Sequence, residues 1–291
     1  MTGKRFVKDF RIAPGGHIRL ADISPSRKAK YQKREALKKI EQLRLKMNDL
    51  QQRLFAERKR SLLIVLQALD AGGKDGVIKH VIGSMNPDGC HVANFKEPTQ
   101  QELSHDFLWR IEAQTPAKGE IAIFNRSHYE DVLIVRVHNL VSKSVWSQRY
   151  DQINDFERRL NLNGTHILKF FLHISKEEQL ARFDQRLDDP AKRWKISESD
   201  YSEREYWDDY LRAYEDAFAR CNTDGAPWFV IPADYKWFRD LAISEIIVST
   251  MEEMNFQVPQ PTVNIEEIRR KYHFAAAEAK RHRASRNPQT R

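Results

Sequence analysis

Short apolar runs alternate along the chain with longer stretches in which apolar residues recur every three or four positions. The runs are rich in branched and aromatic residues, and they predict β-strands at residues 61–69, 90–95, 120–125, 166–174 and 228–232. The stretches between them predict helices at residues 74–84, 101–114, 128–139, 147–160, 175–186 and 236–254. This alternation is typical of an α/β fold in which helices cover both faces of a parallel five-stranded sheet.

Three segments depart from this alternation. Residues 28–60 contain neither glycine nor proline, and their apolar residues recur at helical spacing, so we expect a long helix whose apolar face packs against the rest of the chain. Residues 1–27 lack such a period and predict an irregular arm. Residues 187–222 form a long, charged and mostly helical insertion between the fourth and fifth strands, which favours a helical lid.

The charge divides the chain into three predicted parts: an arm and helix at residues 1–60, a main domain at 61–264 and a basic tail at 265–291. The net charge is +8, but the first part holds 18 Lys and Arg against 6 Asp and Glu, and the tail holds 8 against 3, so the main domain is net acidic. Basic ends are compatible with nucleic-acid binding. No helix-turn-helix, zinc-finger or aromatic RNA-recognition pattern accompanies them, so nucleic acid is not the partner we expect. We expect the tail to fray from residue 281.

Composition excludes several classes of protein. Of the 291 residues, 41% are hydrophobic and 31% are charged, as in globular, helix-rich proteins. The longest apolar runs are far shorter than the ~20 residues of a membrane-spanning helix, and the first residues lack a signal-peptide core. Cys90 and Cys221 stand far apart with no Cys/His cluster, which excludes a thiolate metal site. We therefore expect a soluble, cytoplasmic protein with no membrane partner.

A candidate phosphate loop lies between the first predicted strand and the first helix of the main domain. Residues 67–76 read Q-A-L-D-A-G-G-K-D-G, and in this position backbone N–H groups can surround a phosphate while Lys74 reaches its outer oxygens. Compared with G-x-x-x-x-G-K-[ST], Ala68 replaces the first glycine and Asp75 replaces the hydroxyl residue. Loss of that hydroxyl shifts metal binding to a carboxylate, and Asp70 is well placed for it. The alternative is an ordinary tight turn between strand and helix.

Two further segments carry polar residues suited to phosphate chemistry. Residues 124–130, F-N-R-S-H-Y-E, follow a buried strand at its carboxyl end, where open α/β sheets bind ligands. Arg182 and Arg186 lie one helical turn apart and precede residues 189–197, D-P-A-K-R-W-K-I-S, which add further cations. Arginines spaced in this way can bind phosphate oxygens in pairs. Although Ser127, His128 and Asp131 include the residue types of a hydrolase triad, no G-x-S-x-G turn is present, and we interpret them as a helix start.

Together the three motifs resemble those of the polyphosphate kinase 2 family: D-A-x-G-K-x-G at residues 70–76, F-N-R-S-H-Y-E at 124–130 and D-P-x-K-R-W-K-x-S at 189–197. The resemblance spans residues 28–254. It implies a phosphate-loop (P-loop) kinase fold akin to thymidylate kinase, and Mg²⁺-dependent phosphoryl transfer between inorganic polyphosphate and nucleotides, with Mn²⁺ as an alternative ion. The nucleotides would be AMP, ADP and ATP. It also implies a homo-oligomer, a dimer or a tetramer. With Asn125 in the second motif, the sequence resembles the subfamily that accepts both AMP and ADP.

The resemblance also assigns roles by position. The catalytic residues would be Asp70, Lys74, Arg126 and Glu130, where Asp70 binds Mg²⁺ and orients the acceptor and Glu130 influences how much phosphate the acceptor carries. The nucleotide and its phosphates would be bound by Ala71, Gly72, Gly73, Lys74, Asp75, Gly76, Asn125 and Arg126. A track of cations for polyphosphate in and near the lid would comprise Lys79, Arg182, Arg186, Lys192, Arg193 and Lys195. An ATP-dependent nucleoside monophosphate kinase, which the same scaffold supports, is the alternative enzyme, and a basic nucleic-acid-binding protein is the alternative from another class.

Overall fold

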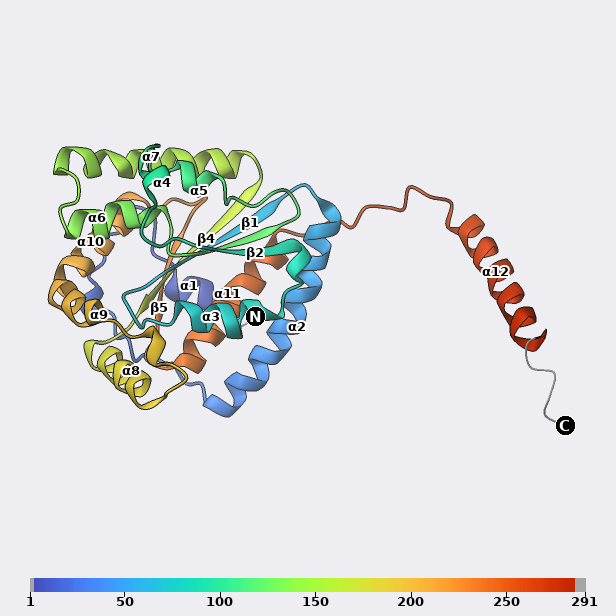
Figure 1. The fold of residues 1–291 in the computed structure, drawn as a ribbon, viewed down its shortest axis with the longest axis horizontal. Helices are drawn as coiled ribbons and strands as arrows, with labels where there is room; N and C mark the ends of the chain where they lie inside the picture. The colour runs from blue at the N-terminus through green and yellow to red at the C-terminus, as the bar shows by residue number, and fades with distance from the viewer. Residues whose placement is uncertain (1–2, 286–291) are drawn as a thin grey trace. The chain divides into compact units, whose positions relative to one another are not determined.

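Five parallel strands form the central sheet in the order β2-β3-β1-β4-β5 (Figure 1). The structure is a computed structural model that describes residues 3–285. The strands are β1 (Ser61–Gln67), β2 (Cys90–Asn94), β3 (Ile121–Asn125), β4 (Thr165–His173) and β5 (Trp228–Pro232). Every strand lies where the sequence predicts it, within two residues at each end, so the α/β fold is confirmed. Because β1 pairs with both β3 and β4, the loop that follows β1 lies in the middle of the carboxyl edge of the sheet.

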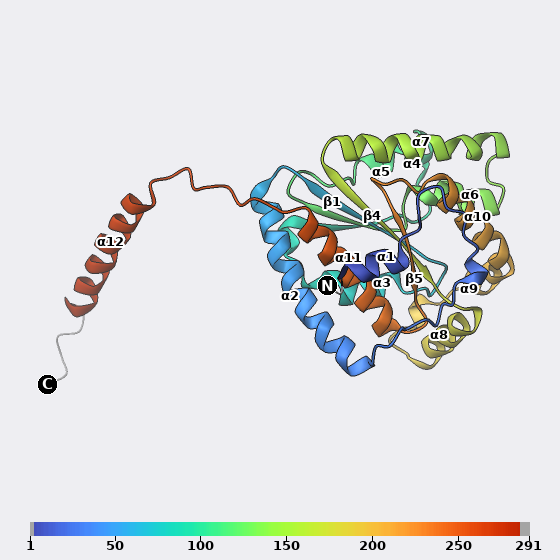
Figure 2. The same ribbon diagram turned by 180° about the vertical axis from the view of Figure 1, so that it is seen from behind.

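Different helices cover the two faces of the sheet (Figures 1 and 2). Alternate residues of β1 point to opposite faces: Leu62 and Ile64 belong to one apolar core, and Leu63 and Val65 to another. The first core includes residues of α1 (Gly3–Phe10), α2 (Lys33–Glu57), α3 (Lys74–His80) and α11 (Lys236–Glu253). Residues of α7 (Lys143–Leu162) and α10 (Trp207–Arg220) pack on the opposite face. Both faces are therefore covered, as predicted.

The predicted long helix is α2, which packs against α11 and runs from 33 to 57 instead of from 28 to 60. The apolar residues of its predicted face are buried from Ile40 to Leu54, whereas Leu37 is 47% exposed, and Leu45, which lies off that face, is 75% exposed. The later start follows from Tyr31, whose ring lies 5.4 Å from that of Phe6 and 6.4 Å from that of Phe238. These contacts hold the chain before residue 33 outside the helix.

The N-terminal arm is more ordered than the sequence predicts. Residues 3–10 form α1, and both Phe6 and Phe10 are buried with their ring centroids 6.0 Å from that of Phe238. Two aromatic residues four positions apart are a short helical signal, which a search for longer periods misses. The expectation of a wholly irregular arm is therefore wrong.

Two predicted helices of the main domain are broken into shorter pieces. In place of a helix over 101–114, α4 (Gln100–Leu103) and α5 (Trp109–Glu112) are separated by a turn. Within this turn the Asp106 carboxylate accepts a 3.0 Å hydrogen bond from the Leu108 N–H. Asp favours such local bonds over helix interiors, which explains the break.

The second broken helix was predicted over residues 128–139. Its place is taken by a 3₁₀ turn, η4 (His128–Val132), followed by α6 (Ile134–Val137). The Ser127 hydroxyl accepts a 3.1 Å hydrogen bond from the Tyr129 N–H and starts the 3₁₀ turn. The tighter turn places Tyr129 and Val132, three residues apart, together in the core.

The remaining elements include the predicted lid. The segment predicted as a lid, residues 187–222, follows α8 (Lys176–Asp188). It contains η5 (Arg193–Lys195), α9 (Glu198–Ser202), η6 (Glu203–Tyr206) and α10. Three further 3₁₀ turns are η1 (Leu20–Asp22), η2 (Ile82–Ser84) and η3 (Pro87–Gly89). The chain divides into one unit that ends at residue 257 and a second from 258, which contains α12 (Ile265–Ser285).

Helix α12 corrects the expectation for the basic tail. Residues 281–285 are helical rather than frayed, and residues 286–291 lie outside the described part of the chain. Within residues 3–285, no helix combines the length and the apolar character needed to span a lipid bilayer.

Candidate active site

The loop between β1 and α3 has the backbone form of a phosphate loop. The chain turns sharply after Leu69, whose carbonyl accepts a 3.0 Å hydrogen bond from the Gly72 N–H. Ala71 (φ +56°) and Gly73 (φ +107°) adopt left-handed conformations, which turn successive peptide groups in a non-helical way. Lys74 then starts α3, and its ammonium group donates to the Ala68 carbonyl at 2.9 Å. The lysine therefore folds back over the loop.

Side chains of α8 bind the carbonyl side of this loop. Gln179 donates to the Asp70 carbonyl at 2.8 Å. Arg182 donates to the carbonyls of Ala71 and Gly72, at 2.8 and 3.1 Å. In a planar trans peptide the N–H points opposite to the C=O, so the N–H groups that follow these carbonyls point away from α8. The N–H of Gly72 is used within the turn, and those of Ala71 and Gly73 remain to face a phosphate group.

Arg182 has no donor left for polyphosphate. Besides the two loop carbonyls, its guanidinium donates to the carbonyls of Ala233 and Asp234, at 2.5 and 3.3 Å, and to Glu178 Oε1 at 2.8 Å. All five of its N–H groups can therefore be assigned to protein acceptors, and the residue is only 5% exposed. Arg182 thus joins the loop to the end of β5, instead of lining the predicted polyphosphate track.

The four predicted catalytic residues lie together around the loop. An Arg126 guanidinium nitrogen lies 3.3 Å from Asp70 Oδ1, and Gln67, the last residue of β1, donates to Glu130 Oε1 at 3.1 Å. Arg126 directly follows β3 and has φ +62°, a strained conformation for a non-glycine residue. Such strain is common at functional sites.

The charges of this cluster influence one another. Burial lowers the pKa of the Lys74 ammonium, and the positive charge of Arg126 lowers it further, while Asp70 and Glu130 oppose the change. Although burial alone would lower the pKa of Arg126, the carboxylates of Glu130 and Asp70 raise it. Two cations and two carboxylates thus share one partly buried region at the carboxyl edge of the sheet.

A residue of the predicted lid also reaches the loop. Lys195 forms an ion pair with Asp75, with 3.0 Å between Nζ and Oδ2. Asp75 also accepts a 3.2 Å hydrogen bond from Asn125, which donates to Asn94 at 2.8 Å. Burial alone would raise the pKa of Asp75, but Lys195 and Asn125 lower it overall. The structure therefore brings together Asp75 and Asn125 with one of the predicted lid cations.

The other predicted lid cations are more loosely held. Arg186 lies 3.9 Å from an oxygen of Asp200, and Lys192 pairs at 2.5 Å with Asp189 on the surface. The Arg193 Nε donates to a backbone carbonyl at 2.8 Å. Lys79 lies exposed in the last turn of α3. These cations do not form one packed cluster.

A buried arginine of α11 explains two glycines of the motif. A Cβ atom added at Gly73 would lie 1.9 Å from a terminal nitrogen of Arg239, and one added at Gly76 would lie 2.9 Å from the other. Arg239 is 2% exposed and pairs with Asp240 at 2.7 Å. Arg239 lies outside the three motifs, in a helix far from them in the sequence, so no motif predicts it. The glycine spacing alone signals that something approaches the loop closely.

A buried polar network supports the segment that carries Arg126 and Glu130. Lys169 of β4 is fully buried, and its ammonium lies 2.7 Å from Glu157 Oε2 and 2.8 Å from the Tyr129 hydroxyl. His128 lies 3.2 Å from Glu157 Oε1, and burial lowers the pKa of its imidazole. His128 is thus part of this buried network, where it lies beside Glu157.

The side chains beside the loop supply few of the ligands that a metal ion needs. Among the residues that the structure describes, no three His, Cys, Asp or Glu side chains come together in a way that could hold a metal. Asp70 is 31% exposed beside the loop, and the buried Gln67 Oε1 has no hydrogen-bond partner within the described residues. Mg²⁺ typically uses one or two carboxylates, with waters and substrate phosphates as its other ligands. These residues therefore fit a magnesium ion bound together with phosphate groups.

Comparisons with known proteins agree with this geometry. Residues 30–259 match the sequence model of a family described as Polyphosphate kinase 2. The chain is 48% identical over 264 residues to an AMP/ADP-polyphosphate phosphotransferase of Meiothermus ruber, covering 90% of this chain and 99% of that one. It is 43% identical to an ADP-polyphosphate phosphotransferase of Rhodopseudomonas palustris, covering 88% and 93%. The crystal structure of a polyphosphate kinase 2 from Arthrobacter aurescens superimposes with a TM-score of 0.88 at 40% identity, covering 92% of this chain and 96% of that one.

Proposed function

The chain belongs to the polyphosphate kinase 2 family, and we propose that it transfers phosphoryl groups between inorganic polyphosphate and both AMP and ADP. One observation carries this proposal: a loop whose free N–H groups face away from α8 lies beside Asp70, Lys74 and Arg126. Phosphoryl transfer requires positioning and neutralisation of charge more than covalent catalysis, and this arrangement supplies both. The names of the relatives support polyphosphate as the donor.

In this proposal, groups around the loop carry each step of the transfer. The N–H groups of Ala71 and Gly73, with Lys74, bind the oxygens of the phosphates on either side of the transferred group. Arg126 neutralises the negative charge that spreads over the equatorial oxygens during transfer. Asp70 orients the acceptor oxygen. Closure of the lid brings Arg186 toward the phosphate chain and excludes water.

Asp70, together with phosphate oxygens, is the residue that we propose as the protein ligand of Mg²⁺. When bound there, the ion would supply positive charge that neutralises the phosphate oxygens. Mn²⁺ has similar oxygen preferences and would serve as an alternative. We also propose a homo-oligomer, a dimer or a tetramer, which light scattering after size-exclusion chromatography would test.

The experiment is direct. The protein is incubated with Mg²⁺ and polyphosphate plus AMP, ADP, GMP or GDP in separate reactions, and the nucleotides are separated by ion-exchange chromatography. We expect ADP and ATP from AMP, and ATP from ADP. Lys74→Ala should abolish most transfer, whereas the matched control Lys118→Ala, an exposed lysine before β3, should retain it. No nucleotide product from any acceptor would contradict the proposal.

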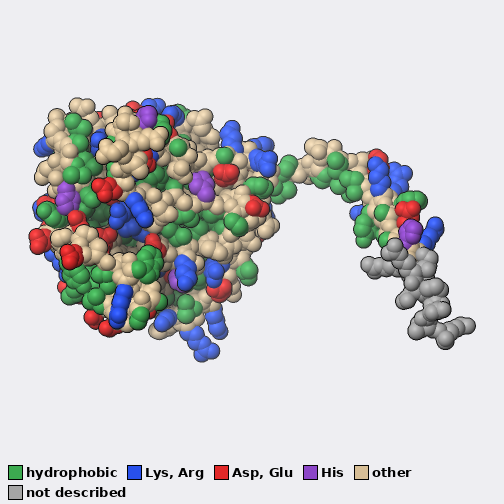
Figure 3. All heavy atoms as spheres, viewed as in Figure 1, with side chains coloured by type: hydrophobic (Ala, Val, Ile, Leu, Met, Phe, Trp, Pro, Cys, Tyr) green, Lys and Arg blue, Asp and Glu red, His purple; other side chains and the backbone are tan. Residues whose placement is uncertain are grey.

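The two alternatives predict different results. An ATP-dependent nucleoside monophosphate kinase would phosphorylate AMP with ATP and not with polyphosphate. A nucleic-acid-binding protein would show salt-sensitive retention of DNA or RNA in a filter-binding assay. Figure 3 shows acidic and basic side chains interspersed over one face of the first unit, with no continuous basic surface there, which does not favour the second alternative.

A further inference from the structure

Two side chains of α8 hold the peptide groups on either side of Ala71. The Gln179 amide donates to the Asp70 carbonyl at 2.8 Å. The Arg182 guanidinium donates to the Ala71 carbonyl, also at 2.8 Å. Ala71 lies between these two peptide planes with φ +56°, a strained conformation that persists only where neighbouring groups hold it. The bond from Gln179 therefore helps to keep the Ala71 N–H pointing away from α8.

The other end of the Gln179 amide is bound by the segment predicted as a lid. Arg204, in η6, donates to Gln179 Oε1 at 2.6 Å and to the Lys176 carbonyl at 3.2 Å. Because Gln179 is only 3% exposed, its amide has little access to water and depends on its two protein partners. One buried side chain thus joins η6 to the phosphate loop, through Arg204 on one side and the Asp70 carbonyl on the other.

The Arg204 guanidinium determines which way the Gln179 amide faces. A guanidinium donates hydrogen bonds and accepts none, so it binds only the oxygen end of the amide. The NH₂ end is then left to face the Asp70 carbonyl, which can only accept. With the amide turned by 180°, oxygen would face oxygen at the loop, and two donors would meet at Arg204. Arg204 therefore holds Gln179 in the one orientation that supports the loop.

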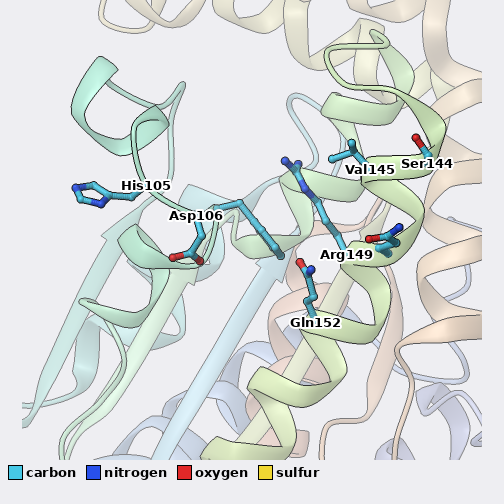
Figure 4. A pocket seen from close by; sticks show the side chains of 8 residues that line it. His105, Asp106, Ser144, Val145, Arg149 and Gln152 are labelled. Carbon is cyan, nitrogen blue, oxygen red and sulfur yellow. The ribbon is translucent and has the colours of Figure 1, made fainter.

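The preceding residue of η6 is attached to the segment that follows β3. Glu203 Oε2 lies 3.0 Å from Nε2 of His138, which directly follows α6. The start of that segment is held by α7: Arg149, one of the residues around the pocket in Figure 4, donates to Asp131 at 2.8 Å. Neighbouring residues of η6 thus contact two parts of the site, the segment after β3 through Glu203 and the phosphate loop through Arg204.

We propose that Gln179 and Arg204 are positioning residues for phosphoryl transfer: Arg204 fixes the Gln179 amide, and Gln179 keeps the Ala71 N–H directed at a phosphate oxygen. This inference rests on the proposed function, in which that N–H binds phosphate. It adds a requirement, because the loop then has its full affinity for phosphate only while η6 lies against α8. Without Arg204 the amide is free to turn, and the peptide between Asp70 and Ala71 is free to flip.

The test measures phosphate binding without turnover. Tripolyphosphate is titrated into the full-length protein by isothermal titration calorimetry, with Mg²⁺ and without nucleotide. Gln179→Met removes both bonds of the amide. Arg204→Met leaves the loop residues unchanged, because the hydrogen bonds of Arg204 within the described residues go to α8. Each variant should raise the Kd for tripolyphosphate about tenfold, which is about 1.4 kcal/mol of binding free energy. The double variant should bind like Gln179→Met alone, since Arg204 acts through Gln179.

Three further variants separate positioning from a general loss of structure. Arg204→Lys keeps a donor that cannot accept, so it should recover most of the affinity. Arg204→Gln can present either end of its amide, so it should not select the orientation of Gln179 and should bind like Arg204→Met. Arg212→Met, at an exposed arginine of α10, is the matched control and should bind like wild type.

The outcomes separate this inference from the proposed function. If Arg204→Met binds tripolyphosphate like wild type, or if the two single losses add in the double variant, the inference is overturned, while transfer by wild type still supports the function. If the variants follow the expected pattern but wild type forms no nucleotide product, the positioning role stands and the proposed function fails. Should Gln179→Met not fold, Arg204→Lys and Arg204→Gln decide alone, since equal Kd values for these two overturn the inference. Failure of wild type to bind tripolyphosphate would overturn it as well.

Discussion

Replacing Arg182 with methionine should both destabilise the protein and weaken its binding of phosphate groups. Methionine fills a similar volume but donates no hydrogen bonds, so five bonds are lost. Those to the carbonyls of Gly72 and Ala233 are buried, and the other three are partly buried, where water can replace the guanidinium. An unsatisfied buried acceptor costs about 1–3 kcal/mol. The free energy of unfolding should therefore fall by about 2–6 kcal/mol.

The effect on function follows from the peptide planes. Without Arg182 the loop carbonyls are free to turn toward water, and the opposite N–H groups then lose their common direction. The KM values for polyphosphate and for AMP should both rise tenfold or more, a loss of at least about 1.4 kcal/mol in binding. Arg182→Lys, which keeps the charge and three donors, should recover part of both losses.

Urea denaturation and steady-state kinetics on the same preparations measure these changes. Arg186→Met is the matched control: it lies one turn further along α8 with weaker contacts, and it should lower the polyphosphate affinity while changing the free energy of unfolding by only about 0.5 kcal/mol. If Arg182→Met instead raised the KM for polyphosphate alone and left stability unchanged, Arg182 would contact the phosphate chain, as the sequence predicts. That result would refute the structural reasoning.

Three other predictions concern the charged groups. Asp70→Asn should lower the transfer rate, and a titration with Mg²⁺ should partly restore it if Asp70 is mainly a metal ligand; no recovery would favour orientation of the acceptor. Replacing Arg186, Lys192 and Arg193 together with glutamine should raise the KM for polyphosphate and flatten its dependence on salt, because fewer counterions are released; an unchanged salt slope would exclude the lid as the polyphosphate track. Glu130→Gln should shift the ratio of kcat/KM values toward ADP over AMP, since a carboxylate near the acceptor phosphates repels ADP more; an unchanged ratio with unchanged rates would remove Glu130 from the site.

The sequence predicts the strands of the sheet well because buried parallel strands are short, continuous apolar runs bounded by turns. Helix limits are less well predicted, since local hydrogen bonds such as those of Ser127 and Asp106 override helical periodicity. These bonds depend on rotamers that the pattern does not show.

Within the candidate site, the sequence predicts the residues that lie in motifs. It does not predict the residues that support those motifs. Asp70, Lys74, Arg126 and Glu130 were predicted to act together, and the structure places them in one cluster. The sequence predicts that Arg182 faces polyphosphate because it lies one helical turn from another arginine. This spacing does not show which way the Arg182 side chain points. Its real partners are backbone carbonyls, which every residue has and no motif reveals.

The central position of β1 has a consequence for biosynthesis. The ribosome makes β1 and the phosphate loop early, but their partners come later in the chain. β1 pairs on one side with β4, and the loop carbonyls accept hydrogen bonds from Gln179 and Arg182. A ribosome makes the chain from its N-terminus at about 5–20 residues per second, so these partners arrive several seconds after the loop. The last, Arg239, packs against the loop only when nearly the whole first unit has been made. A nascent chain therefore carries the complete loop sequence long before it can hold the loop in its final form.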